Sequence, residues 1–381
     1  MSQFTRPFSC LLAVGLALGR VGHATDVIDS EKARFKVETV ADGLEHPWGM
    51  VQLPDGRFLF TERPGRVRVI DKDGKLLPDE VQGLPELYHA YEGGLLDIEL
   101  HPDYAKNGWI YFTFAKPGEG GGLTAVFRAR LDGMKLKDYQ LIYDPPAADF
   151  TRREIHFGSR LTFDKENHVY FSIGDRGEWT DAKNPAQNLG SARGKIHRLN
   201  DDGTIPKDNP FVDTKGALPS IWSWGHRNPQ GLRFEPGTDL LWESEHGPRG
   251  GDELNIIKKG ANYGWPLVTF GVNDNGTIIT DKTSAPGMED PVFQWTPSIA
   301  VSGIGFYTGD KFPKWKGNLF AAALNFERLV RNEISDDHKI AHQEVLLEGT
   351  GRIRDVRTFG DGFLYVIYDD PGRIVKLVPA D

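Results

Sequence analysis

Short apolar runs, separated by polar turns, account for most of the chain from residue 34 onward. Each unit consists of one apolar run, a turn, and a second run centred on an aromatic residue or leucine. Runs this short are typical of β-strands, and helical periodicity is scarce. Asp-Gly or Asn-Gly pairs stand at 55–56, 73–74, 202–203, 275–276 and 361–362. Because these pairs tolerate positive φ, they favour tight hairpins, and the pattern predicts an all-β protein.

The same unit recurs six times, with a spacing of roughly sixty residues. The copies are GMVQLPDGRFLF (49–60), LLDIELHPDYAKNGWIYFTF (95–114), RLTFDKENHVYFSI (160–173), GLRFEPGTDLLWES (231–244), GIGFYTGDKFPKWKGNLFAA (303–322) and DVRTFGDGFLYVIY (355–368). The second strands centre on Leu59, Tyr111, Tyr170, Leu241, Phe320 and Tyr365. Six such units predict a six-bladed β-propeller. Two β-sandwiches are the alternative, which is disfavoured because the copies resemble one another and no linker separates two halves.

Closure of the ring is expected at the two ends of this repeat region. RFKVETV (34–40) reads as a strand and would pair beside RIVKLV (373–378) in the last blade. Such pairing leaves no free sheet edge at the junction.

The first 24 residues predict a secretory signal peptide. Arg6 supplies a positive start, SCLLAVGLALG (9–19) is a short apolar core, and Ala24 ends a small-residue cleavage site. The run is too short to span a bilayer, and no other run is long enough. The single cysteine, Cys10, lies in this segment, so residues 25–381 would form one propeller domain without a thiol. A periplasmic or secreted location is therefore expected.

The formal net charge of -9 over 381 residues argues against nucleic acid or an anionic membrane as the main partner. An anionic ligand would have to be bound by local arginines rather than by the whole surface.

Three polar stretches stand just before apolar strands, at the entrances to different predicted blades. EIHFGSRL (154–161) carries His156, GHRNPQGL (225–232) carries Arg227 and Asn228, and GRIRDVRT (351–358) carries Arg352 and Arg354. Since propeller loops converge on one axis, and these residues all stand at a similar distance before the following apolar strand, we expect their side chains to lie together. Arginines brought together repel one another unless an anion with several carboxylates or phosphates lies between them. His156 is either a proton acceptor or a hydrogen-bonded structural histidine.

The fourth predicted blade continues through SEHGPRGGDELN (244–255) and GANYGWP (260–266). Its Gly and Pro carbonyls, with Asp252 and Glu253, offer only oxygen ligands, which suits calcium; a solvated acidic loop is the alternative. There is no Gly-x-Ser-x-Gly, Walker or His-Glu-x-x-His motif, so hydrolase and nucleotide functions based on those motifs lack support.

Taken together, HFGSRL, GHRNPQGL, SEHGP-x-GGDELN, NYGWP and RIRDVR resemble the soluble quinoprotein aldose sugar dehydrogenases of the glucose/sorbosone dehydrogenase family. The resemblance covers nearly the whole chain from about residue 40. It implies a six-bladed propeller that binds pyrroloquinoline quinone (PQQ) and Ca²⁺. It also implies oxidation of aldoses at C1 to lactones, with electrons passed to an acceptor that the sequence does not identify.

Site residues follow from the resemblance position by position. It implies that His156 takes the proton of the C1 hydroxyl and that Arg227 lies near the reactive cofactor oxygen. The cofactor contacts implied are Glu92, Arg227, Asn228, Asn325, Arg352 and Arg354. The calcium ligands implied are the carbonyls of Gly247 and Pro248 for one ion, and Glu253 and Tyr263 for a second.

This chain departs from the family pattern at three positions. Glu92 replaces a glutamine, Asn325 replaces a lysine, and Asp274 replaces a tyrosine. The first two make the site less positive, which predicts weaker binding of an anionic cofactor by on the order of 1 kcal/mol each. Two alternatives stay open: a calcium-dependent sugar-lactone hydrolase, and a propeller that binds a ligand without catalysis. Residues 267–300 are expected to form a loop over the pocket that selects the substrate.

Overall fold

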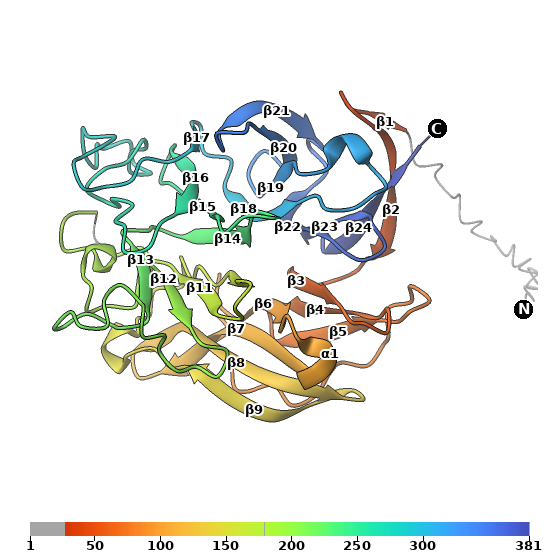
Figure 1. Ribbon diagram of the computed structural model, residues 1–381, viewed down its shortest axis with the longest axis horizontal. Coiled ribbons are helices and arrows are strands. Elements are labelled where there is room, and N and C mark those ends of the chain that lie inside the picture. The colour runs from red at the N-terminus through yellow and green to blue at the C-terminus, as the bar shows by residue number, and fades with distance from the viewer. Residues whose placement is uncertain (1–26, 179, 381) are drawn as a thin grey trace, which may run out of the picture.

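The computed structural model describes residues 27–178 and 180–380. The predicted signal segment and Cys10 lie outside the described residues. Six antiparallel sheets follow one another along the chain and surround a common centre (Figure 1). The predicted six-bladed β-propeller is confirmed. No helix in the described part of the chain is long and apolar enough to cross a membrane.

The strands of the six sheets have the following bounds. The first sheet contains β3 (Pro47–Gln52), β4 (Phe58–Glu62) and β5 (Arg66–Ile70); the second contains β6 (Leu95–Leu100), β7 (Trp109–Gly118), β8 (Gly121–Asp132) and β9 (Lys135–Tyr143). The third contains β10 (Leu161–Phe163), β11 (Val169–Ile173), β12 (Lys195–Leu199) and β13 (Ile221–Trp224); the fourth contains β14 (Pro229–Phe234), β15 (Leu241–Glu245), β16 (Asp252–Ile257) and β17 (Phe293–Trp295). The fifth contains β18 (Val301–Phe306), β19 (Leu319–Ala323), β20 (Arg328–Ile334) and β21 (Ile340–Leu346); the sixth contains β22 (Arg352–Thr358), β23 (Leu364–Asp370), β24 (Arg373–Pro379), β2 (Arg34–Ala41) and β1 (Ile28–Asp29).

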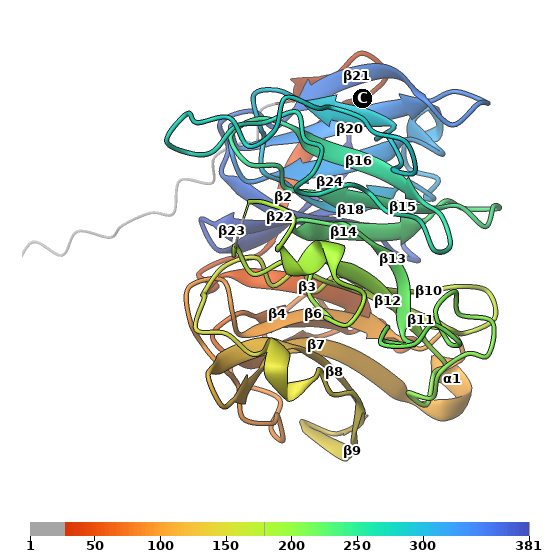
Figure 2. The ribbon, with the colours of Figure 1, turned by 90° about the vertical axis from the view of Figure 1, so that its left-hand side faces the viewer.

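Within residues 27–178 and 180–380, helical structure is confined to short connections. These are α1 (Tyr104–Asn107) and the 3₁₀ turns η1 (Ala147–Asp149), η2 (Pro185–Gln187) and η3 (Pro313–Trp315). The longest connection, between β16 and β17, extends beyond the sheets in the side view (Figure 2).

Each predicted repeat forms the first two strands of one sheet. Ring closure also follows the prediction: β2 pairs with β24, with Phe35 opposite Pro379 and Val37 opposite Leu377. The first sheet differs, because it has three regular strands. Leu77 and Val81 still donate backbone hydrogen bonds to β5, but Pro78 between them has no N–H and interrupts the fourth strand.

The core lies between the sheets, with one apolar cluster for each of the six neighbouring pairs. All six central residues of the second strands belong to these clusters and are at most 5% exposed. Every sheet therefore buries both faces, which explains why the strands read as apolar runs.

The first strands approach one another closely at the axis. A Cβ on Gly49 would lie 2.5 Å from Asp97 Oδ1, and one on Gly303 would lie 2.0 Å from Asp355 Oδ1. Both aspartates bind the buried guanidinium of Arg160, at 3.1 and 3.0 Å. This tight axis fixes the relative positions of the loops that precede the first strands.

Candidate functional site

A cavity of about 360 Å³ opens at one end of the axis. All six sheets contribute to its wall through first strands or adjoining loops; examples, one per sheet, are Trp48, Leu96, Gly158, Gln230, Ala300 and Arg354. Trp48, Leu96 and Phe157 form a buried apolar cluster on one part of the wall. Guanidinium and carboxylate groups line the rest, so the cavity suits a ligand with an apolar body and charged substituents.

The predicted site residues divide into three groups. Glu92, Asn228, Arg352 and Arg354 line this cavity. Arg227, Gly247, Glu253 and Tyr263 line a smaller adjoining pocket, and His246 lines both. His156, Pro248 and Asn325 line neither, although the residues that follow His156 form part of the cavity wall.

His156 lies in the turn before β10, with a φ of 58°. Its backbone N–H donates to Glu92 Oε2 at 2.6 Å, which anchors this turn to the second blade. The ring Nδ1 lies 2.7 Å from Asp175 Oδ1. Since an ionised carboxylate only accepts, Nδ1 carries the hydrogen, and in the neutral ring Nε2 is the nitrogen with the free lone pair. The arrangement is that of an oriented base, in which the carboxylate stabilises the ring when it becomes protonated.

Asp175 is the orienting group that the sequence did not reveal. Its Oδ2 accepts from Trp265 Nε1 at 2.7 Å and from Asn184 Nδ2 at 2.9 Å. Burial alone would raise the pKa of this carboxyl, but the charge of His156 and its hydrogen bond, and then the charge of Arg227, lower the pKa to about 2. The carboxylate is therefore ionised at neutral pH.

Asp175 should make stability pH-dependent in acid. Its folded-state pKa of about 2 lies below an unfolded value of about 3.9. Ionised Asp175 therefore contributes on the order of 2 kcal/mol to the free energy of unfolding above about pH 4. This contribution is lost as the pH falls towards about 2. Denaturant unfolding of the unchanged protein and of Asp175→Asn at about pH 5 and about pH 2.5 tests this. The free energy of unfolding should fall less between the two pH values in the variant than in the unchanged protein. An equal fall in both proteins would contradict the lowered pKa of Asp175.

Arg352 and Arg354 alternate along β22 and face the cavity together. Arg354 is 6% exposed; its Nη1 donates to Gln230 Oε1 at 2.8 Å, and its Nε is buried without a partner. Arg352 Nη1 donates to the Leu324 carbonyl at 3.1 Å. Asp369 lies 3.7 Å from Arg352 and 3.9 Å from Arg354. Burial lowers the pKa of Arg354 to about 10, so the group remains charged at neutral pH.

Arg227 turns towards the smaller pocket. Its Nη1 donates to the carbonyls of His246 and Gly247, at 3.1 and 2.7 Å, and its Nε is buried without a partner. The carbonyl of Pro248 accepts from Ser298 Oγ at 3.0 Å. Each of the two proposed calcium-binding carbonyls thus accepts one hydrogen bond and keeps a second lone pair.

His246 is a further residue that the sequence analysis missed, although it lies within a quoted motif. Its Nε2 is buried without a partner. Burial lowers its pKa well below the ordinary range, and the charges of Arg227, Arg354 and His156 act in the same direction. The ring is therefore a neutral hydrogen-bonding group between the two pockets.

Two of the three departures from the family pattern lie away from the cavity. Asn325 is exposed, and its Nδ2 donates to the Ser298 carbonyl at 3.1 Å. Asp274 is exposed in the long connection between β16 and β17. From residues 267–300, only Ala300 lines the cavity, while Val268 and Thr269 line the smaller pocket.

A buried carboxylate cluster lies beside the smaller pocket. In the β15–β16 pair, Glu243 faces Asn255 and Glu245 faces Glu253. Asn255 Nδ2 lies 3.0 Å from Glu243, 3.3 Å from Glu253 and 3.5 Å from Glu245. Burial, and then the neighbouring charge of Glu245, raise the pKa of Glu243 and of Glu253 well above the ordinary range.

Two oxygens of this cluster, Glu243 Oε1 and Asn255 Oδ1, are buried without a partner. Besides this neutral amide, His226 Nδ1 lies 3.2 Å from Glu245 Oε1, and no lysine or arginine of the described residues pairs with the three carboxylates, so the cluster favours a cation with oxygen ligands. The pairs at 243/245 and 253/255 were visible as i, i+2 spacings, but their meeting depends on hairpin register. Asp252, by contrast, accepts the backbone N–H groups of Gly247 and Val301, one on each carboxylate oxygen.

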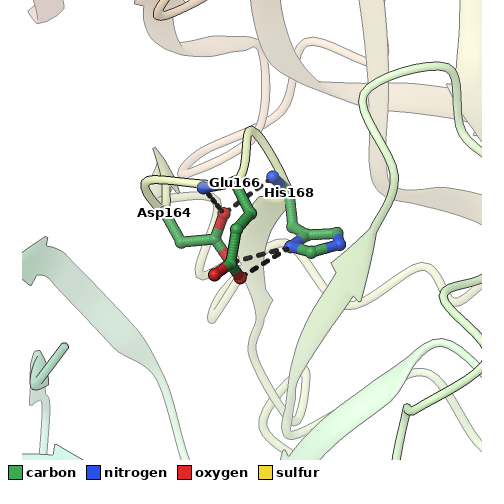
Figure 3. Close-up of side chains that lie close together, drawn as sticks. All are labelled: Asp164, Glu166 and His168. Carbon is green, nitrogen blue, oxygen red and sulfur yellow. Dashed lines mark hydrogen bonds and ion pairs between the residues drawn. The ribbon is translucent and has the colours of Figure 1, made fainter.

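A second acidic cluster, formed by Asp164, Glu166 and His168, lies in the β10–β11 turn (Figure 3). Asp164 accepts the backbone N–H groups of Glu166 and His168, and His168 Nδ1 lies 2.9 Å from Asp164 Oδ2. The guanidinium of Arg198 lies 3.0 Å from His168 Nδ1 and supplies the positive charge. This cluster closes a turn, and we assign no metal to it.

Comparison with known proteins identifies the family. A model of the family described as Glucose / Sorbosone dehydrogenase matches residues 44–376. The chain belongs to this family. Among members of the glucose/sorbosone dehydrogenase family, it is 40% identical to aldose sugar dehydrogenase YliI of Escherichia coli over 356 residues, which cover 92% of this chain and 94% of that protein.

Solved structures of two aldose sugar dehydrogenases have the same fold as this chain. The apo form of the soluble aldose sugar dehydrogenase from Escherichia coli has a TM-score of 0.84 at 38% identity, covering 91% of this chain and 100% of that chain. The PQQ-bound form of aldose sugar dehydrogenase from Streptomyces coelicolor has a TM-score of 0.73 at 30% identity, covering 91% and 98%.

Proposed function

We propose that this protein is a PQQ- and calcium-dependent aldose dehydrogenase that oxidises the sugar C1 to the lactone. The observation that supports this most is an axial cavity lined by several arginines, with an imidazole oriented by a buried carboxylate in the turn that continues into the cavity wall. The PQQ-bound relative from Streptomyces coelicolor supports the same cofactor. We further propose that the chain acts after export, in the periplasm or outside the cell, with residues 1–24 as the signal.

The residues present fit PQQ, a flat tricarboxylate. The Nε–H groups of Arg63 and Arg354 at the cavity, and of Arg227 beside it, are buried without a protein partner. Unpaired buried donors are costly, and a carboxylate relieves that cost. Arg352 and Arg354 would hold carboxylates, and Asn228 would add an amide. When bound, PQQ supplies the two-electron acceptor.

The chain's own part in the reaction is proton transfer and orientation. Oxidation of the C1 hydroxyl to a carbonyl removes one proton from oxygen and two electrons with the hydrogen on carbon. His156 Nε2 would accept the hydroxyl proton, and Asp175, 2.7 Å from Nδ1, would stabilise the imidazolium. The buried apolar wall of Trp48, Leu96 and Phe157 would exclude water from one side of the ligand.

The two proposed calcium sites differ in the ligands that the protein supplies. At the carbonyls of Gly247 and Pro248 the protein supplies two neutral oxygens, so an ion there would take most of its ligands from the cofactor and water. Near Glu253 and Tyr263, the buried carboxylate cluster supplies the charge and unpaired oxygens that calcium prefers.

Calcium should raise the midpoint of thermal unfolding by a few degrees at saturation, since binding to the folded state alone contributes roughly 2–3 kcal/mol at 100 times Kd. Glu253→Gln should remove most of this shift, because it removes one carboxylate of the cluster. Glu166→Gln, in the turn cluster of Figure 3, is the matched control and should keep the full shift. Differential scanning calorimetry of both variants, with calcium and with magnesium, measures the shift in the unfolding midpoint. An unchanged shift in Glu253→Gln would contradict the proposed site.

The function itself is tested by reconstitution. The purified protein is loaded with PQQ and calcium, and aldose-dependent reduction of an artificial dye is measured. Dye reduction that requires PQQ supports the proposal. Hydrolysis of sugar lactones without any quinone would instead support the hydrolase alternative, and neither activity in a folded, PQQ-binding protein would support a binding module.

A further inference from the structure

Arg63 is a cavity-lining cation that no motif singled out. It follows β4, is half-buried, and lines the axial cavity with Arg352 and Arg354. Its Nε is buried without a partner. Among residues 27–178 and 180–380, its side chain has no hydrogen-bond partner and no carboxylate within 4.0 Å. The guanidinium therefore lies in the cavity wall without a direct ion pair, and its charge acts on Asp369 from beyond 4.0 Å.

The carboxylates of the cavity wall have other partners or face solvent. Asp369 lies within 4 Å of both Arg352 and Arg354 and 3.1 Å from His46 Nδ1. Glu92 accepts the backbone N–H of His156, and Asp370 is exposed to solvent. No carboxylate of the described wall thus lies within 4.0 Å of the Arg63 guanidinium.

The backbone of Arg63 is fixed from both sides. Its N–H donates to the His46 carbonyl, and its own carbonyl accepts from the N–H of Leu95, each at 3.0 Å. The chain at Gly94 approaches so closely that a Cβ there would lie 1.9 Å from the Arg63 carbonyl oxygen. An arginine that starts from a fixed backbone loses less entropy when it binds a ligand.

The position of Asn325 makes Arg63 more important for binding an anionic ligand. Asn325 stands where the resemblance places a lysine, yet it is exposed and bonded to the Ser298 carbonyl, outside the cavity lining. The arginines that line the cavity and could bind an anionic ligand are therefore Arg352, Arg354 and Arg63.

We propose that Arg63 binds a carboxylate of the anionic ligand in the axial cavity and, with Arg352 and Arg354, completes a three-guanidinium site. The identity of that ligand as PQQ rests on the proposed function. The contact itself rests on the absence of a direct ion pair at Arg63 and on its fixed backbone.

Calorimetric titration of the full chain with PQQ tests the contact. Arg63→Gln should raise the Kd about 10- to 100-fold, as expected for a hydrogen bond to a charged group, and Arg63→Lys should raise it less. Arg57→Gln is the matched control, because Arg57 pairs with Asp55 near the surface of the same sheet; its Kd should stay within about twofold. The apo forms of all variants should unfold at similar temperatures.

The trimethyl ester of PQQ separates a carboxylate contact from a general loss of shape. With the ester, which has no charge for Arg63 to bind, Arg63→Gln should change the Kd by less than about threefold. A Kd for PQQ in Arg63→Gln within about twofold of the unchanged protein, or an equal loss for acid and ester, would overturn the inference.

Failure of the proposed function has a different signature. If the unchanged protein bound no PQQ, the assignment of PQQ as the cofactor would be rejected. The proposed contact of Arg63 with a carboxylate would then be tested by titration with benzene-1,3,5-tricarboxylate. Binding of that probe that weakens in Arg63→Gln would support the contact. Absence of any Arg63-dependent binding would reject it.

Discussion

Replacing His156 with alanine should lower the turnover of aldoses by about 10²- to 10⁴-fold while leaving the Kd for PQQ within about twofold. The variant loses the only imidazole nitrogen that Asp175 orients at 2.7 Å. It keeps the backbone N–H that donates to Glu92, so the turn before β10 retains its anchor to the second blade. Steady-state kinetics with an artificial dye and a separate PQQ titration measure the two quantities.

The matched control for this prediction is His168→Ala. His168 also lies 2.9 Å from a carboxylate, that of Asp164, but in an outer turn of the third blade. Its loss should leave kcat nearly unchanged. A comparable fall in kcat in both variants, or a parallel loss of PQQ binding in His156→Ala, would show that His156 has a structural role rather than that of a base.

Replacing Arg354 with alanine should mainly weaken cofactor binding. The guanidinium is 6% exposed and has one buried N–H without a partner, so a carboxylate bound there is largely shielded from water. Removing one partner of a buried charge pair costs roughly 2–5 kcal/mol, which corresponds to a rise in Kd of about 30-fold to a few thousandfold. At saturating PQQ, kcat should recover to near the unchanged value. Titration and steady-state kinetics on the same preparation check this.

Arg233→Ala is the control for Arg354→Ala. Arg233 is a largely buried arginine that lines a hollow among first-strand residues of the second, third, fourth, fifth and sixth sheets, and it lies 3.3 Å from Glu99. It shares burial and charge with Arg354 but does not line the axial cavity. A similar loss of PQQ affinity in both variants would indicate that general destabilisation, not a ligand contact, explains the result.

The fold could be predicted from the sequence because its signal is local and repeated. Each blade places an apolar or aromatic residue at the centre of its second strand, and Tyr111, Leu241 and Phe320 are buried there as expected. The interrupted fourth strand of the first blade was also visible in principle, since Pro78 cannot donate to the ladder.

The site could be predicted only in part, because its residues meet through long-range assembly. Arg352 and Arg354 share one strand face, and this spacing is readable from the sequence alone. Arg63 and Asp175 lie in turns after second strands, where nothing in the local pattern marks them. The orientation of Asn325 depends on a contact with Ser298, and the grouping of Glu243, Glu245 and Glu253 depends on hairpin register.

A difference electron-density map from crystals of the protein soaked with PQQ tests the central claim most directly. We predict density for one PQQ molecule in the axial cavity, with its carboxylates within hydrogen-bond distance of Arg63, Arg352 and Arg354 and with the His156 ring facing it. Density elsewhere on the protein, or an axial cavity that remains free of PQQ at saturating concentration, would contradict the assignment of this cavity as the redox site.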